Sequence, residues 1–120
     1  QRPWREIPTW LKAADVLVIP NTGREDISKY HTSPLKLFEY MASGRPVVAS
    51  DIPSIREIAD KTMVWFALPD DPQSLAGVVA AALNNSEDAA KRRGRARKEA
   101  ARYTWAARAE VICAYLRDSR

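Results

Sequence analysis

Short apolar runs alternate with helix-like segments along this chain, and that alternation limits the folds open to it. Val16 to Ile19, Pro46 to Ala49 and Met63 to Phe66 are continuous apolar runs, typical of strands covered on both faces. Strands that alternate with helices pair in parallel through right-handed crossovers. We therefore expect an α/β fold, a partial Rossmann-like doubly wound domain with about three parallel strands and flanking helices.

Local signals predict the elements between these strands. A short helix is expected from Pro8 to Ala14 because apolar residues recur there at helical spacing. The polar, turn-rich segment Asn21 to Thr32 is expected to be a loop. Ser54 and Glu57 form a capping-box pattern, so a second short helix is predicted to begin at Ser54.

The second half of the chain is expected to be mainly helical. Asp71 and Pro72 open a helix with a long apolar stripe. Two further helices are predicted, from about Glu87 to Tyr103 and from Trp105 to Leu116. The single cysteine, Cys113, excludes an internal disulfide framework and a cysteine metal cluster. Because Cys113 lies on an apolar stripe, we expect it in the core or at its boundary.

The segment that begins at Ser33 carries the strongest functional signal. Ser33 is expected to cap a helix, Pro34 suits the first helical position, and Gly44 suits its end. The helix is predicted to be largely buried because apolar residues occupy most of its circumference. A helix N-terminus that follows a parallel strand is a typical place for a nucleotide phosphate.

One acidic residue, Glu39, interrupts this apolar helix. Lys36 and Glu39 are three residues apart and therefore share a helical face. They form either a surface ion pair that contributes little to stability or a cation and a carboxylate presented to a ligand. The spacing alone favours neither interpretation.

Four motifs identify a family resemblance. SPLKLFEYMASGRPVVASDIPSIRE, from Ser33 to Glu57, resembles the donor-nucleotide segment of family 4 glycosyltransferases, the large retaining group 1 class with a two-domain GT-B fold. AADVLVIP, PDDP and YTW occur around it in the order and at about the intervals of that family. The resemblance covers nearly the whole chain.

The resemblance also indicates which part of such an enzyme this is. Because 120 residues leave room for one ordinary domain at most, residues 1–120 are expected to be part of a C-terminal nucleotide-sugar-binding domain. Residues 104–120 would form a terminal helix that packs back toward an N-terminal domain. We therefore expect a fragment of a hexosyltransferase-type enzyme that is inactive by itself and whose catalytic residues are unknown.

The same resemblance implies roles for four residues of the motif. Glu39 matches a glutamate that accepts hydrogen bonds from the ribose hydroxyls of the donor. Leu35 matches a position whose backbone N–H faces the donor diphosphate, with Lys36 beside it. Ser33 belongs to the same donor-binding turn.

Two positions depart from the family pattern. His31 stands where the family has a glutamate near the donor sugar, so His31 and Thr32 are expected in the vicinity of that sugar. Pro34 replaces a frequent glycine and removes one phosphate-facing N–H. His31 is the only histidine, and we favour its interpretation as an ordinary loop residue over that of a catalytic base.

Charge is concentrated in one predicted helix. Lys91 to Arg102 contains seven basic residues and one acid, whereas the whole chain has a net charge of +4. In most such helices the basic residues form a solvent-exposed face that has no binding role, and we favour this interpretation. Weak peripheral contact with an anionic membrane is a secondary hypothesis, and nucleic acid is not expected because aromatic residues and a binding motif are lacking.

The expected function is transfer of a sugar from a nucleotide-diphosphate sugar to an acceptor glycan or lipid-linked sugar, with this part binding the donor. No cofactor is expected, and no metal is implied by ligand spacing. The alternatives are a non-catalytic glycosyltransferase-like or basic anion-binding module and, less favoured, a nucleotide-sugar 2-epimerase. No membrane span or signal peptide is present in the sequence, so a cytoplasmic location is expected, with or without peripheral membrane contact.

Overall fold

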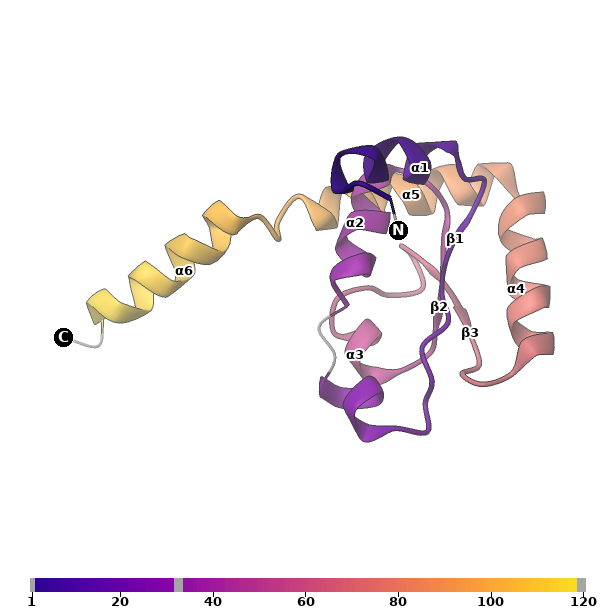
Figure 1. Ribbon diagram of the computed structural model, residues 1–120, viewed down its shortest axis with the longest axis horizontal. Helices are drawn as coiled ribbons and strands as arrows, with labels where there is room; N and C mark the ends of the chain where they lie inside the picture. The colour runs from indigo at the N-terminus through magenta and orange to yellow at the C-terminus, as the bar shows by residue number, and fades with distance from the viewer. Residues whose placement is uncertain (1, 32–33, 119–120) are drawn as a thin grey trace.

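A three-stranded parallel sheet lies at the centre of the molecule (Figure 1). The computed structural model describes residues 2–31 and 34–118. The strands are Leu17–Ile19 (β1), Val47–Ser50 (β2) and Trp65–Ala67 (β3), in the order β1-β2-β3. Both pairs are parallel, as predicted from the alternation of strands and helices.

The third strand begins later than predicted. Met63 and Val64 belong instead to a turn in which their backbone N–H groups donate to the Asp60 carbonyl, at 3.0 and 3.1 Å. The Asp60 carboxylate reinforces this turn by accepting from the Thr62 N–H at 2.7 Å. The local hydrogen bonds of the turn therefore compete with pairing to β2 at these two residues.

Helices cover both faces of the sheet (Figure 1). Val47 and Ala49 point to one face, where they pack with residues of three helices: Leu35–Ser43 (α2), Pro53–Arg56 (α3) and Ser86–Ala100 (α5). Val48 points to the other face, toward Pro72–Asn84 (α4). All of β2 is buried, because alternate side chains enter two different apolar clusters.

Helix α2 connects β1 to β2 and begins one residue later than expected. Pro34, predicted at the first helical position, occupies the N-cap position. Gly44 ends the helix with φ +74°, as the sequence predicted. Leu37 and Met41 are fully buried, but Leu35 is 67% exposed. The prediction of a largely buried helix is therefore wrong in extent, because full burial is confined to the side chains that face the sheet and α5.

Two local predictions before and after α2 are also wrong. Part of the expected loop forms a π-helical turn, Ile27–His31 (η2). Ser54 does not cap α3, which begins at Pro53 with Ile52 as its N-cap. Ser54 is instead buried, and its Oγ–H donates to the Ser28 carbonyl at 3.1 Å. The proline fixes the start of α3 and frees the serine for this contact with η2.

Side chains cap the first turns of the next two helices. The Asp71 carboxylate accepts from the Ser74 N–H at 2.9 Å, which confirms the predicted start of α4. Asn85 caps α5 by accepting from the Asp88 N–H at 3.1 Å. The small apolar face of α5 packs on the domain, since Ala89, Ala96 and Ala100 are all buried.

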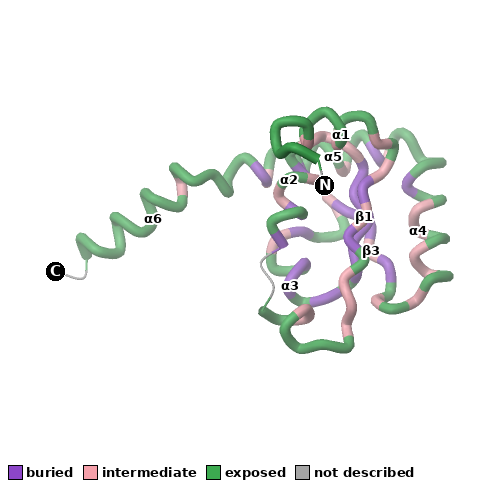
Figure 2. The backbone as a smooth tube through the Cα atoms, in the orientation of Figure 1, coloured by how far each residue is buried: buried purple, intermediate pink, exposed green. Residues whose placement is uncertain are grey.

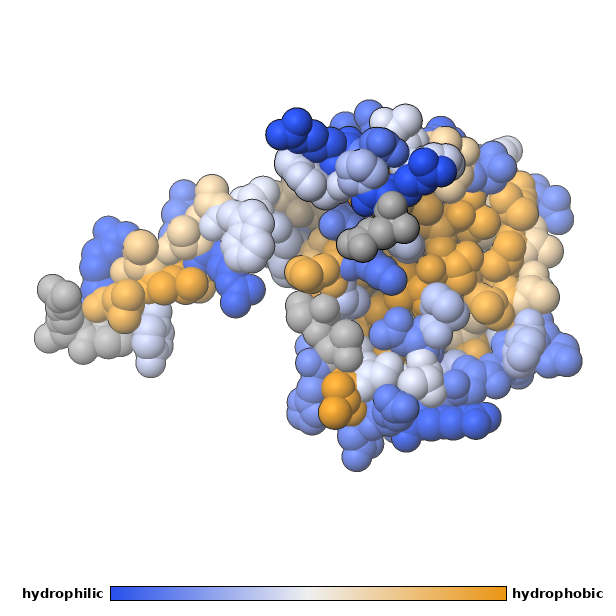
Figure 3. All heavy atoms as spheres, viewed as in Figure 1, coloured by the Kyte–Doolittle hydropathy of each residue, from blue (hydrophilic) through white to orange (hydrophobic). Residues whose placement is uncertain are grey.

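The last helix, Trp105–Asp118 (α6), extends away from the rest of the molecule (Figures 1 and 2). Cys113 is exposed, so its predicted place in the core is wrong, because α6 does not pack on the sheet. Apolar side chains gather along one side of α6 (Figure 3). Within the described part of the chain, no helix combines the length and the apolar character that crossing a membrane requires.

Candidate functional site

The N-terminal turn of α2 presents the predicted phosphate-facing residues to solvent. Leu35 and Lys36 are both exposed and lie in the first helical turn, where backbone N–H groups have no acceptor within the helix. The first hydrogen bond of this turn runs from the Leu37 N–H to the Pro34 carbonyl at 2.8 Å. Ser33 and Thr32, both predicted near the donor, lie outside the described residues.

Glu39 lines a pocket of about 390 Å³ between α2 and the first two helices, Trp4–Glu6 (η1) and Ile7–Ala13 (α1). Glu39 is exposed, so its carboxylate is not enclosed in the apolar core. The other residues that line this pocket are Trp4, Ile7, Pro8, Leu11, Lys12, Ala42 and Ser43. The pocket therefore combines a mainly apolar wall with one carboxylate and one ammonium group.

A side chain that follows α2 holds α1 in place beside the pocket. Arg45 donates from its guanidinium to the Lys12 carbonyl at the end of α1. The two helices also contact each other directly. Because the carbonyls of a helix C-terminus attract cations, Arg45 fixes the position of α1, and with it one wall of the pocket.

The ion-pair interpretation of Lys36 and Glu39 finds no support in this arrangement. Among the described residues, the ion pairs do not include one between Lys36 and Glu39. The two side chains are both exposed on the same helix. The Glu39 carboxylate is consequently available to a ligand in the pocket.

His31 lies apart from that pocket. It is exposed at the end of η2, with its ring edge-on to Tyr30 and 6.4 Å between the ring centroids. It does not line the Glu39 pocket. Leu35, Lys36 and Glu39 lie on one helix, with Glu39 alone of the three in the pocket lining, and His31 ends the preceding element η2.

The carboxyl end of β2 carries an ion pair that the sequence analysis did not identify. Arg56 donates to both Asp51 oxygens, at 2.7 and 2.9 Å, and its guanidinium lies 3.7 Å from the Phe66 ring centroid. These hydrogen bonds lower the pKa of Asp51 from its ordinary value, against a smaller opposing effect of burial. The close spacing of Asp51 and Arg56 in the sequence was the available signal.

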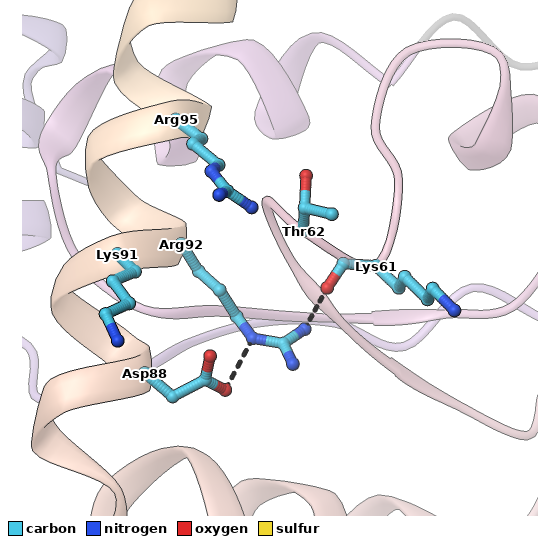
Figure 4. Close-up of a pocket in the computed structure, with 6 residues that line it drawn as sticks. All are labelled: Lys61, Thr62, Asp88, Lys91, Arg92 and Arg95. Atoms are coloured by element: carbon cyan, nitrogen blue, oxygen red, sulfur yellow. Dashed lines mark hydrogen bonds and ion pairs between the residues drawn. The ribbon is translucent and has the colours of Figure 1, made fainter.

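A smaller pocket of about 230 Å³ lies beside the basic helix α5 (Figure 4). The guanidinium of Arg92 is occupied there, since it donates to Asp88 at 2.7 Å and to the Lys61 and Val64 carbonyls. Lys61 points away from Arg95 (Figure 4). The basic groups of this pocket do not converge on one point. Arg92 instead joins α5 to the turn that precedes β3.

Metal-ligating side chains do not cluster within the described ranges, where no group of three or more His, Cys, Asp or Glu residues could hold an ion.

Residues 2–85 match the family model described as "Glycosyl transferases group 1". The amylovoran biosynthesis glycosyltransferase AmsK of Erwinia amylovora is 33% identical over 79 residues, which cover 65% of this chain and 19% of AmsK. The chain spans about a fifth of the length of the curated relatives that it matches.

Solved structures show the same fold. HepE of Anabaena, crystallised in complex with UDP, superposes with a TM-score of 0.79 at 20% identity over 96% of this chain and 30% of HepE. The C-terminal domain of a group 1 glycosyl transferase, LpcC of Francisella tularensis, gives a TM-score of 0.68 at 22% identity over 86% of this chain and 50% of that chain. The three-stranded parallel sheet and its helices therefore match the C-terminal domain of such enzymes.

Proposed function

The chain belongs to the group 1 glycosyl transferases, and we propose that it binds the donor nucleotide in a retaining, family 4 enzyme that transfers a hexosyl group. The observation that carries this proposal is the exposed Glu39 carboxylate in the wall of the pocket between α1 and α2. The donor would be a nucleotide-diphosphate sugar. The acceptor would be a glycan or a lipid-linked sugar.

The chemistry of the pocket suits a nucleoside. An ionised carboxylate accepts several hydrogen bonds, so Glu39 is able to accept from both hydroxyls of a ribose. Ile7 and Leu11 supply apolar wall, and Trp4 offers an aromatic surface for a base. Ligand pockets typically combine such walls with a few polar groups that fix orientation. The UDP named in the HepE structure supports this assignment.

The diphosphate would lie at the first turn of α2. The Leu35 and Lys36 amides and the helix dipole favour an anion there, and the Lys36 ammonium adds positive charge. In this role the protein orients the donor and stabilises the leaving diphosphate electrostatically. The proposal assigns no step to a metal ion.

Helix α6 would complete the enzyme by packing on an N-terminal domain. Its exposed apolar residues favour such a partner: Trp105 is 82% exposed, Val111 70% and Tyr115 72%. A contact of this kind would bury the apolar stripe and cover residues 104–120 in the longer protein. It would also bring the acceptor-binding part of the enzyme toward the donor pocket.

A calorimetric titration tests the donor site. Glu39→Gln is nearly isosteric and lies on an exposed helix face, so the fold should be kept. It should weaken UDP binding by about 1.5–3 kcal/mol, the value of lost hydrogen bonds to a charged group. Affinity for inorganic diphosphate should scarcely change, because that ligand has no ribose. Glu57→Gln, another exposed glutamate, is the matched control, and equal UDP affinity in wild type and Glu39→Gln would remove Glu39 from the site.

A further inference from the structure

Two turns meet at the carboxyl end of the sheet although their strands are not neighbours. The turn after β1 contains Thr22 and Gly23, and the turn after β3 contains Pro69 and Asp70. The Asp70 carboxylate accepts from the Gly23 N–H at 2.9 Å and is hydrogen-bonded by the Thr22 side chain. Since β2 lies between β1 and β3, this contact joins the two outer strands beyond the end of the central one.

The backbone at Asp70 is in a conformation that L-residues rarely adopt. Its φ is +60°, and among the described residues it is the one non-glycine with positive φ. Steric contact between Cβ and the following carbonyl disfavours this region. The left-handed backbone is retained here together with the two hydrogen bonds that its carboxylate accepts, which suggests that those bonds compensate for the strain.

Gly23 is the complementary half of the contact. A Cβ at this position would lie 3.0 Å from Pro69 Cγ and 3.1 Å from Pro69 Cβ, too close without a shift of the proline ring. The Arg24 guanidinium adds a longer ion pair, with 3.9 Å between its Nε and Asp70 Oδ2. The two turns are therefore fitted to each other by shape and by charge.

The segment that Asp70 holds precedes α2 in the sequence. After Gly23 it continues through η2, where the Ser28 carbonyl accepts from the buried Ser54 hydroxyl. Within residues 21–31, Gly23 is thus held by the turn after β3 and Ser28 by α3. Both attachments come from elements that follow α2 in the sequence.

We propose that Asp70 is a positioning residue, which holds residues 21–31 through the Gly23 amide and so sets the orientation of the first turn of α2. Its importance for donor binding rests on the function proposed above for Leu35, Lys36 and Glu39. Asp70 itself touches no proposed ligand group. Its effect on the donor would be exerted through the segment that it holds.

Amide hydrogen exchange followed by NMR measures this effect directly. Asp70→Gly removes the carboxylate and also relieves the positive φ, so the melting temperature should be unchanged or higher. The Gly23 amide should nevertheless exchange about tenfold faster or more, and the hydrogen-bonded amides of Lys29 in η2 and Leu37 in α2 should follow it. Asp70→Asn, which keeps an acceptor oxygen, should restore part of the protection.

Two further variants make the test specific. Gly23→Ala breaks the contact from the opposite side and should increase the same exchange rates. Asp26→Asn removes an exposed carboxylate of the same segment and should change none of them. Unchanged exchange at Gly23 and α2 in Asp70→Gly, or equal effects of Asp70→Gly and Asp26→Asn, would overturn the proposal.

UDP titration of the same variants separates this inference from the proposed function. Weaker binding in Asp70→Gly, with partial rescue in Asp70→Asn, is the expected result. If the wild type binds UDP and Asp70→Gly binds it equally well, the positioning role is overturned while the donor site stands. If the wild type does not bind UDP, the donor site fails, and the exchange rates alone decide whether Asp70 orients α2.

Discussion

The Arg92 guanidinium lies 4.5 Å from the centroid of the Trp65 ring, and this contact joins α5 to the first residue of β3. The same guanidinium donates to Asp88 and to two carbonyls of the preceding turn. The ring and the carbonyls belong to a segment about 30 residues earlier in the sequence. Arg92 is therefore a structural anchor, although it lies in the most basic part of the chain.

Arg92→Ala should destabilise the fold because it leaves several acceptors unpaired. We expect a loss of about 2–4 kcal/mol in the free energy of unfolding, from hydrogen bonds to a charged group and the ring contact. Arg92→Lys should lose less, since it keeps the charge but not the planar fork. The neighbouring Arg93→Ala, at an exposed position, is the control in urea unfolding. Equal losses in the free energy of unfolding for Arg92→Ala and Arg93→Ala would contradict the anchoring role of Arg92.

Two glycine substitutions should change stability in opposite directions. Gly44 ends α2 with φ +74°, whereas Gly77 lies inside α4, and neither position has an atom within 4 Å of an added Cβ. Gly44→Ala should cost about 1–2 kcal/mol because of left-handed strain. Gly77→Ala should stabilise by about 0.5–1 kcal/mol through helix propensity. Melting of the two variants beside the wild type measures both effects, and a stabilised Gly44→Ala would disprove the helix end described here.

Acid should weaken the fold through the paired aspartates. The hydrogen bonds from Arg56 lower the pKa of Asp51 below 3.8, and those from Thr62 lower the pKa of Asp60. Because the folded-state pKa is the lower one, the stabilisation is present above pH 3.8 and is lost as the pH falls through the folded pKa. Asp51→Asn should therefore flatten the decline in melting temperature between about pH 5 and pH 2. Parallel curves for the variant and the wild type would show that this pair does not couple folding to protons.

His31 and Trp4 should affect the donor differently. Trp4 lines the pocket with Glu39 and His31 does not, so Trp4→Ala should weaken UDP binding while His31→Ala leaves it nearly unchanged. Trp10→Ala, a second exposed tryptophan outside the pocket lining, is the control. Calorimetric titration gives the three affinities. A larger loss of UDP affinity for His31→Ala than for Trp4→Ala would instead indicate a donor site near η2.

The basic side of α5 is the proposed site of weak membrane contact. Arg95 and Lys98 are exposed on one side of the helix, and Arg93 and Arg97 are exposed on another. Neutralising Arg95 and Lys98 to Gln should reduce binding to vesicles rich in anionic lipid by on the order of tenfold or more, from about 1 kcal/mol per basic residue. Neutralising Arg93 and Arg97 to Gln changes the net charge by the same amount and is the control. Equal losses for both pairs would indicate a general charge effect and no defined membrane-facing side.

Patterns that act over a few residues predicted much of this fold. The strands were placed within two residues because buried parallel strands require continuous apolar runs. Gly44 and Asp71 marked helix ends because left-handed backbone and unpaired N–H groups have strong residue preferences. Ser54 was misassigned because the capping pattern does not include its contact with Ser28, a residue 26 positions away.

Local sequence patterns predicted one part of the candidate site, and contacts between distant residues formed the other part. The sequence by itself determined that an acidic residue stands on an apolar helix after a buried strand, since spacing places Lys36 and Glu39 on one face. Only the tertiary structure decided that α1 forms the other wall of the pocket and that Asp70 reaches Gly23 across the end of β2. Neither contact has a local signature, because each depends on how the sheet brings together segments that are far apart in the chain.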